Sequence, residues 1–192
     1  MDPIDFTPAT RAVAAVLSGI GDDQLTASTP CPDFSVADLL DHLSGLALAF
    51  TLAARKEPLP DGGQPVVDGS QLSPAWRTEI PAALEGLAAA WTDPAAYDGL
   101  TMAGPIEMPG DIAALVALDE VVVHGWDLAR ATGQPYDPGD ASVLASLGFA
   151  SSFEVPPEAG PGPFGPPVPV PDSAPPLDRL AGATGRNPGW AP

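Results

Sequence analysis

The chain has 192 residues, about the length of one domain, and 45% of them are apolar. That share supplies a sizeable core and excludes a chain that is disordered throughout. Seven basic residues stand against 25 acidic ones, and the formal net charge is −18. Nucleic acid and anionic membranes would repel such a chain and are not expected as partners. The sequence shows no signal peptide or membrane-spanning run, and its single cysteine suits a reducing compartment, so we expect a cytoplasmic protein.

The first two predicted helices begin at recognisable start signals. Thr7-Pro8 places an N-cap residue before a proline at the first helical position, and apolar residues then recur with helical spacing. The second helix is expected from Ser35 to about Arg55. Its first residues, Ser35-Val-Ala-Asp38, resemble a capping box.

The middle of the chain alternates loops with two more helices. A loop rich in proline and glycine spans residues 57–72, and a third helix is predicted over 73–91. Residues 97–108 are expected to form a short hairpin with Ala103-Gly104-Pro105 at its tip. The fourth helix is predicted from Pro109 to Thr132, followed by turn residues that end it.

Residues 1–155 are therefore predicted to form an all-α domain, a four-helix bundle with a fifth helix over 138–153. The segment 156–192 differs, because it holds 12 of the 26 prolines. Proline prevents helix and central strand, so we expect an extended, proline-rich C-terminal strap with a short helix near 176–184. A disordered tail is the alternative. Apolar residues such as Phe164 favour docking, either on the same subunit or on a neighbour.

Both histidines of the chain lie on the inward-facing apolar stripes of predicted helices. His42 is on the second helix. Glu120 and His124 are four residues apart on the fourth, so their side chains share one face. A buried carboxylate and imidazole need partners, and a divalent cation would satisfy both. Two histidines and a glutamate are a known ligand set for catalytic zinc with an open fourth position. Nickel, iron and manganese accept the same donors, so the pattern leaves the metal open.

Two aspartates could support these ligands. Asp127 follows His124 by three residues and could be a further ligand or a hydrogen-bond acceptor behind it. Asp38 lies one turn before His42 and could hold the second ring nitrogen of that histidine. The competing interpretation is a buried Glu120–His124 ion pair without metal. Acidic residues are abundant in this chain, and a core histidine is more often hydrogen-bonded than metal-bound.

Cys31 lies in a Pro-Cys-Pro turn just before the second helix. It is either a thiol at the mouth of the site or a small buried apolar residue, and the second interpretation is favoured because nothing nearby lowers a thiol pKa. The glycine-rich segments follow no strand, so they do not predict a phosphate loop, and there is no G-x-S-x-G elbow. The residues assign no catalytic role beyond metal ligation.

Three ordered blocks carry a resemblance to a known family. They are Thr-Pro-Cys-Pro-Asp-Phe-Ser-Val at 29–36, Asp-His-Leu at 41–43, and Leu-Asp-Glu-Val-Val-Val-His-Gly-Trp-Asp-Leu-Ala-Arg-Ala-Thr-Gly at 118–133. Together they resemble the actinobacterial metal-binding proteins related to the N-terminal domain of mycothiol-dependent maleylpyruvate isomerase, which are DinB-like four-helix bundles. The resemblance implies that His42, Glu120 and His124 are the metal ligands, with zinc as the first choice and nickel or iron as alternatives.

The resemblance also implies a chemistry. In the isomerase the metal binds a low-molecular-weight thiol as a thiolate, which attacks an electrophilic substrate. We therefore expect a mycothiol-dependent S-transferase or isomerase-like enzyme with a small thiol and an electrophile as partners, and a homodimer by analogy. The alternative is a non-catalytic metal-binding or interaction protein with a structural site. This sequence departs from the family at Phe34, where tryptophan is usual and a packing change is expected. The isomerase has a separate C-terminal domain, whereas here only the proline-rich strap is expected after the bundle.

Overall fold

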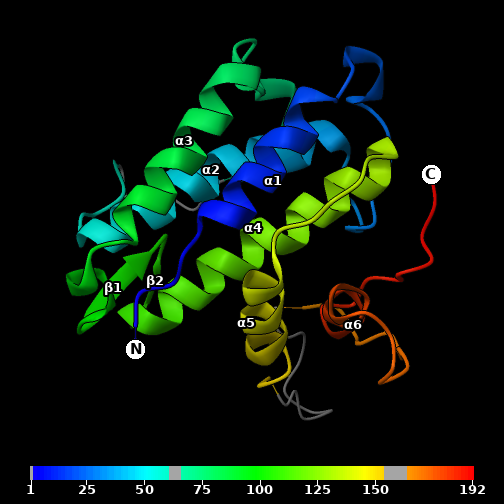
Figure 1. Cartoon of the computed structure of the whole chain (residues 1–192). Coiled ribbons are helices and arrows are strands. Elements are labelled where there is room, and N and C mark those ends of the chain that lie inside the picture. Colours follow the sequence, from blue (N-terminus) through cyan, green and yellow to red (C-terminus); the bar gives the residue numbers. More distant parts are fainter. Residues whose placement is uncertain (1, 61–65, 154–163) are drawn as a thin grey trace.

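The computed structural model describes residues 2–60, 66–153 and 164–192, and it confirms a helical bundle with one small hairpin (Figure 1). The long helices are α1 (Thr7–Ser18), α2 (Val36–Arg55), α3 (Trp76–Ala90) and α4 (Gly110–Thr132), and the shorter ones are α5 (Asp140–Ala150) and α6 (Pro176–Ala183). Strands β1 (Leu100–Ala103) and β2 (Ile106–Pro109) form the hairpin, and single 3-10 turns occupy Asp22–Gln24, Gly69–Gln71 and Pro94–Tyr97.

The core lies between the four long helices. α2 packs against α3 and α4, and α1 packs against the same two helices from the other side. α2 has the length and mean hydropathy, 1.4, of a membrane span, yet half of that window is buried inside the protein. Its Leu39, Leu40 and Leu43 are completely buried in the common core. Its hydropathy is therefore accounted for by its central place in the bundle.

The structure confirms the predicted start of the second helix and corrects the starts of the first and the third. Ser35 and Asp38 form the predicted capping box, each side chain accepting a hydrogen bond from the other residue's backbone N–H. The predicted N-cap of the first helix is wrong, because Thr7 already lies in the first turn of α1. Its backbone N–H donates to the Asp5 carboxylate instead. α3 starts later than predicted, at Trp76, since the preceding residues form a turn.

The hairpin before α4 agrees with the prediction. β1 and β2 are antiparallel, with Ala103 opposite Ile106. Gly104 lies between them with a φ of +60°, a left-handed conformation that glycine adopts without strain. The Thr101 hydroxyl donates a 2.6 Å hydrogen bond to the backbone oxygen of Ala53 in α2. The hairpin thereby fixes the start of α4 beside the end of α2.

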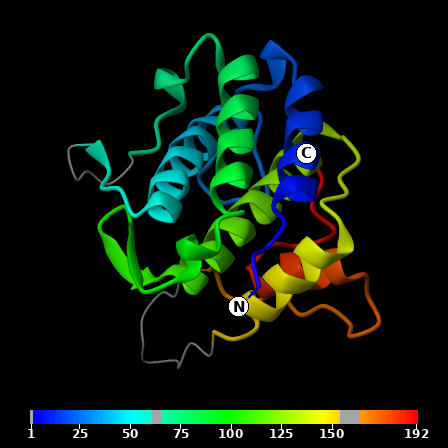
Figure 2. The same ribbon diagram turned by 60° about the vertical axis from the view of Figure 1, so that its left-hand side comes forward.

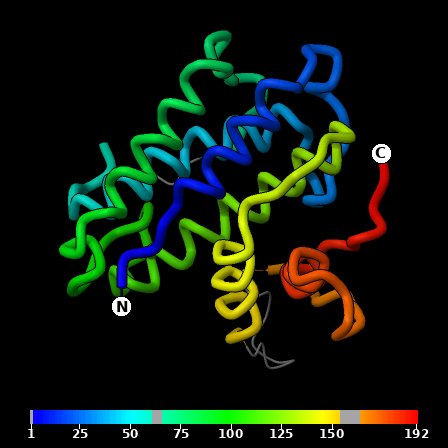
Figure 3. The backbone as a smooth tube through the Cα atoms, in the orientation of Figure 1, coloured from blue at the N-terminus to red at the C-terminus, as the bar shows by residue number. Residues whose placement is uncertain are grey.

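The described part of the C-terminal strap docks on its own chain, around α5 and the C-terminal half of α4 (Figures 2 and 3). Phe164 packs its ring against the aromatic rings of α5 and the residues just after it. The backbone N–H of Val168 donates to the oxygen of Gly182, and Arg130 of α4 donates to two carbonyl oxygens near the C-terminus. The first residues of the predicted strap, and the expected domain boundary at residues 155 and 156, lie outside the described residues.

Candidate metal centre

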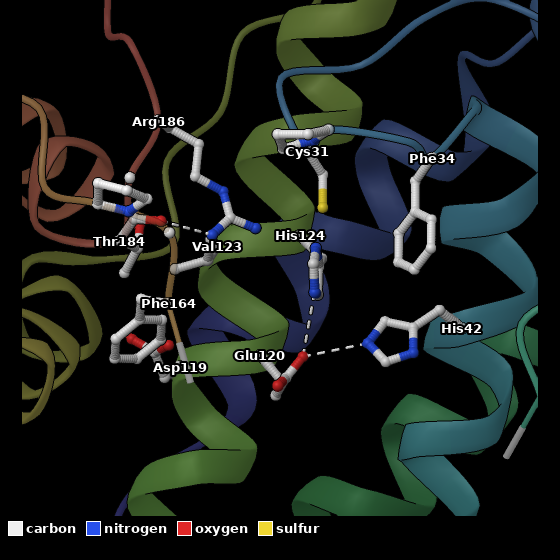
Figure 4. Close-up of a pocket in the computed structure, with 14 residues that line it drawn as sticks. Cys31, Phe34, His42, Asp119, Glu120, Val123, His124, Phe164, Thr184 and Arg186 are labelled. Atoms are coloured by element: carbon white, nitrogen blue, oxygen red, sulfur yellow. Dashed lines mark hydrogen bonds and ion pairs between the residues drawn. The ribbon is translucent and has the colours of Figure 1, made fainter. Parts of the chain in front are cut away.

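The three side chains predicted as metal ligands meet in the structure (Figure 4). The Glu120 carboxylate oxygen Oε2 lies 3.2 Å from Nε2 of His42 and 3.0 Å from Nε2 of His124. The imidazole rings face each other edge to face, with their centroids 4.9 Å apart. All three donor atoms lie within 4.8 Å of one another. The helical stripes of α2 and α4 therefore place one donor from α2 against two from α4.

The spacing of the donor atoms suits a small divalent ion. Ligand atoms bound tetrahedrally to zinc at about 2.0–2.1 Å are roughly 3.3 Å apart. The two measured separations around Glu120, 3.0 and 3.2 Å, are close to that distance. Slight movements of the side chains would let the three donors surround an ion. The residues present therefore fit the group that the ligand pattern implies.

When no metal is bound, the electrostatics of the cluster are those of a half-buried ion pair between Glu120 and His124. Burial raises the pKa of Glu120, but hydrogen bonds and charges from His124 and His42 outweigh it, and the net pKa lies well below the ordinary value. For His124, burial lowers the pKa, while hydrogen bonds to Asp127 and Glu120 raise it to about 9. The same geometry therefore supports the ion pair and the metal site.

Asp127 lies behind His124, where it was predicted to be a ligand or a hydrogen-bond acceptor. Its Oδ2 is 3.0 Å from Nδ1 of His124, and its side chain is completely buried. A carboxylate at this place keeps a proton on Nδ1 and directs Nε2 toward the Glu120 carboxylate. The geometry therefore matches the role of acceptor.

Asp38 is used elsewhere. One oxygen of its carboxylate accepts from the backbone N–H and hydroxyl of Ser35, and the other accepts from the backbone N–H of Gly69. These hydrogen bonds lower the pKa of Asp38. Among the described residues, none of its hydrogen bonds reaches His42. Its function is to cap α2 and to fasten the following loop, which corrects the expectation that it holds the His42 ring.

Arg186 belongs to the centre, although no pattern in the sequence indicates it. Its guanidinium donates to both oxygens of Asp127, at 3.0 and 3.4 Å, and to the backbone oxygen of Thr184 at 2.8 Å. The two charged residues are 59 positions apart, so no local pattern links them. The sequence holds one indirect indication of the pair. It has only seven lysines and arginines, so a buried acidic residue has few possible partners.

A cavity of about 310 Å³ opens beside the three donors. One wall is the turn at residues 31–34 before α2, and the opposite wall is built by residues 164–166 and 184–186 of the C-terminal segment. Phe34 lines it with its ring centroid 6.0 Å from that of His42. The family difference at position 34, expected to affect packing alone, thus lies in the wall of the site.

Cys31 and Asp119 also line this cavity. Burial raises the pKa of the half-buried Cys31 thiol to about 11, so it stays protonated at neutral pH. Cys31 therefore lies at the site, as expected of a thiol at its mouth. Its thiol is nevertheless unreactive, as expected of a small, partly buried residue. Burial and the neighbouring Glu120 charge raise the pKa of Asp119 to about 8. Its Oδ1 accepts no hydrogen bond from the described residues.

A second hollow reaches the same donors from the hairpin side. It measures about 240 Å³ and shares His42 and Glu120 with the first cavity. Its remaining walls are apolar side chains of α2, such as Leu46 and Phe50, and the turn between β1 and β2. The donor atoms are thus approachable from two directions. The first cavity adds Asp119 and Arg186 to the donors, whereas the second adds only apolar residues and the glycine of the hairpin turn.

Comparison with known proteins supplies the family. The family described as "Mycothiol maleylpyruvate isomerase N-terminal domain" matches residues 6–129, about two thirds of the chain. The chain belongs to this family. The matched range runs from the start of α1 nearly to the end of α4 and contains His42, Glu120 and His124.

The relatives agree with this assignment. Uncharacterized proteins from two strains of Mycobacterium tuberculosis are each 34% identical over 192 residues, which covers 97% of this chain and 98% of each relative. Crystal structures of the mycothiol-dependent maleylpyruvate isomerase and of a histidine-to-alanine mutant share the fold at a TM-score of 0.56, with 20% and 18% identity over 74% of this chain. The match spans 66% of the isomerase chain, slightly under two thirds. This likeness shows that the chain shares the helical-bundle fold of the isomerase, in agreement with the predicted all-α bundle.

Proposed function

We propose that this protein is a divalent-metal-dependent enzyme, an S-transferase or isomerase-like protein that uses mycothiol. His42, Glu120 and His124 would hold the metal, with zinc as the first choice and nickel or iron as alternatives. The observation that carries the proposal is the convergence of two imidazole Nε2 atoms on one carboxylate oxygen, at 3.2 and 3.0 Å. Membership of the isomerase N-terminal domain family supports the same reading.

The side chains around the centre have different roles in this proposal. A divalent ion held there would supply positive charge that lowers the pKa of a bound thiol or water. Asp127 orients His124 through its Nδ1 proton. Cys31 remains a neutral thiol, because burial raises its pKa to about 11. The nucleophile in this proposal is therefore the thiolate of a bound small molecule, or water, rather than the protein's own cysteine.

An open site favours catalysis over a structural metal. Structural zinc sites are closed by four protein ligands, whereas catalytic ones leave a position free. Here the side chains of His42 and Glu120 are 24% and 32% exposed, and two hollows adjoin them. Two hollows also leave room for two reactants, a thiol and an electrophile. The non-catalytic alternative predicts instead that a chelator unfolds the bundle.

The identity of the electrophile is left free in this proposal. About a third of the isomerase chain has no counterpart in the match, so that enzyme's own substrate is not transferred to this protein. A small thiol, mycothiol in the first place, remains the proposed cofactor, and a reducing cytoplasm suits a protein with one free cysteine.

Cobalt substitution tests the proposed function. The protein is loaded with Co²⁺, and its visible spectrum is followed while mycothiol is added. We expect a new sulfur-to-cobalt band, because a thiolate enters the open position. S-methylated mycothiol is the matched control and should leave the spectrum unchanged. A spectrum that does not change at saturating mycothiol would refute the thiol-dependent role.

A further inference from the structure

A line of charged groups connects the C-terminal segment to the metal centre. Arg186, three residues after the end of α6, donates to Asp127 at 3.0 and 3.4 Å. Asp127 lies 3.0 Å from Nδ1 of His124, and Nε2 of the same ring faces Glu120. The arginine therefore reaches the ligand cluster through a single intermediate residue, from the side opposite the other ligands.

The pair is built into the interior. Asp127 is completely buried and Arg186 is 9% exposed. A buried carboxylate that loses its cation keeps the cost of its burial, and Arg186 is the arginine that pairs with Asp127 inside the protein. The guanidinium contacts both Asp127 oxygens, which fixes the plane of the carboxylate as well as its position. The plane of that carboxylate in turn sets the orientation of the His124 ring.

The backbone around Arg186 is held equally firmly. The backbone N–H of Arg186 donates to the oxygen of Ala181 at 2.8 Å, and its side chain donates to the oxygen of Thr184. Gly185 has a φ of +82° and lies so close to Gly165 that a Cβ would come within 2.9 Å of its backbone. Both glycines line the cavity beside the proposed ligands. Arg186 therefore reaches its position beside Asp127 only when this segment is docked.

We propose that Arg186 is a positioning residue of the metal centre. It holds Asp127 so that His124 presents Nε2 to the ion, and it couples metal binding to docking of residues 164–192. By linkage, a segment that favours metal binding when docked is itself held more firmly when metal is bound. The effect of Arg186 on metal binding rests on the proposed function. The positioning of His124 by Arg186 through Asp127 does not depend on that function.

Metal affinity tests the inference in the full-length protein. The dissociation constants of Zn²⁺ and Co²⁺ are measured by competition with a chelator for Arg186→Met and Arg186→Lys. Loss of a residue that orients a ligand typically weakens metal binding 10- to 100-fold. We expect at least a tenfold loss for methionine and a smaller loss for lysine, which keeps the charge without the two-point contact. A folded Arg186→Met protein whose affinity stays within twofold of wild type would overturn the proposal.

Two arginines provide matched controls. Arg179 lies in α6 and forms no ion pair with the described residues. Arg130 holds the last residues of the segment through the backbone oxygens of Pro188 and Trp190 and forms no hydrogen bond or ion pair with Asp127. Arg179→Met and Arg130→Met should both keep the metal affinity within about threefold of wild type. A loss in Arg130→Met equal to that in Arg186→Met would show that segment docking alone matters, which would refute the specific role of Arg186.

A metal-independent readout separates this inference from the proposed function. In ¹⁵N-labelled protein without metal, the Nδ1 proton of His124, hydrogen-bonded to a buried carboxylate, should give a downfield and slowly exchanging signal. We expect it in wild type and in both controls, and we expect its loss or displacement in Arg186→Met. If wild type binds no metal, the proposed function fails, while an unchanged His124 signal in Arg186→Met would refute the positioning role. If Arg186→Met does not fold, Arg186→Lys carries the same test.

Discussion

One carboxylate oxygen occupies the centre of the site. Oε2 of Glu120 is within hydrogen-bond distance of both histidines, at 3.2 and 3.0 Å. Without metal, Glu120 forms a half-buried ion pair with His124. With metal, Glu120 and the two histidines would together be the ligands. Both states use nearly the same side-chain positions, which explains why the i, i+4 spacing of Glu120 and His124 could not distinguish them.

The titration of the centre predicts how metal-free stability depends on pH. The pKa of His124 is about 9 in the folded protein and near 6.5 when unfolded, so the folded state keeps a proton that the unfolded state releases between these values. The free energy of unfolding should therefore fall as the pH rises from 6.5 to 9, by at most about 1.4 kcal/mol per pH unit for this proton. Asp119, with a pKa raised to about 8, acts in the same direction from about pH 4 upward.

Denaturant unfolding at a series of pH values measures this dependence. Asp119→Asn is the control variant, because it removes one of the two groups and should flatten the decline below pH 6.5. Glu120 has the opposite sign, since its lowered pKa stabilises the fold above its ordinary range and this stability is lost in acid. Metal affinity should rise over the interval in which stability falls, because Nε2 of His124 must lose its proton to bind. Metal-free stability that increases from pH 6.5 to 9 would contradict the assigned ion pair.

The residues of the site differ in how far sequence could find them. His42, Glu120 and His124 were predictable because each interrupts an apolar helical stripe with a group that cannot be buried alone. Arg186 was not, because its partner Asp127 is distant in sequence and only the docked C-terminal segment brings them together. Asp119 was missed because its buried environment comes from tertiary packing, which no periodicity records.

Helix ends were predictable where the signal was local. The Ser35 cap of α2 and the glycine that ends α4 at position 133 both act within a few residues. The Thr7-Pro8 signal was misplaced by one position because Asp5, further upstream, supplies the acceptor for the first turn. The course of the C-terminal segment was left open, since proline excludes helix and central strand without saying where an extended chain binds.

Gly185 tests whether the C-terminal segment is docked as described. Gly185→Ala places a side chain at a φ of +82° and against the backbone of Gly165, so it should destabilise docking by roughly 1–3 kcal/mol. Gly86→Ala is the matched control, because Gly86 lies in α3 with nothing within 4 Å of an added Cβ, and it should stabilise slightly. Limited trypsin digestion after Arg179 and Arg186 gives the readout. Cleavage of Gly185→Ala at the wild-type rate would argue against the docked segment.

At the scale of the whole molecule, the helices of the family domain are completed by a C-terminal segment that lies outside the family match. The family match ends at residue 129, and the four-helix core up to that point holds all three proposed ligands. The wall opposite them comes from residues 164–166 and 184–186, beyond the match. If the ligands are common to the family and this cavity wall is not, the metal would activate a thiol in the same way, while the wall would select different substrates.

The metal content of protein purified without an affinity tag tests the central claim most directly. Elemental analysis of wild type should find one divalent ion per chain, and His42→Ala and His124→Ala should each lose most of it. Phe34→Ala, beside His42 in the cavity wall but without a donor atom, should retain it. Wild-type protein that holds no divalent ion, even after dialysis against zinc, would contradict the account, as would full occupancy in His42→Ala.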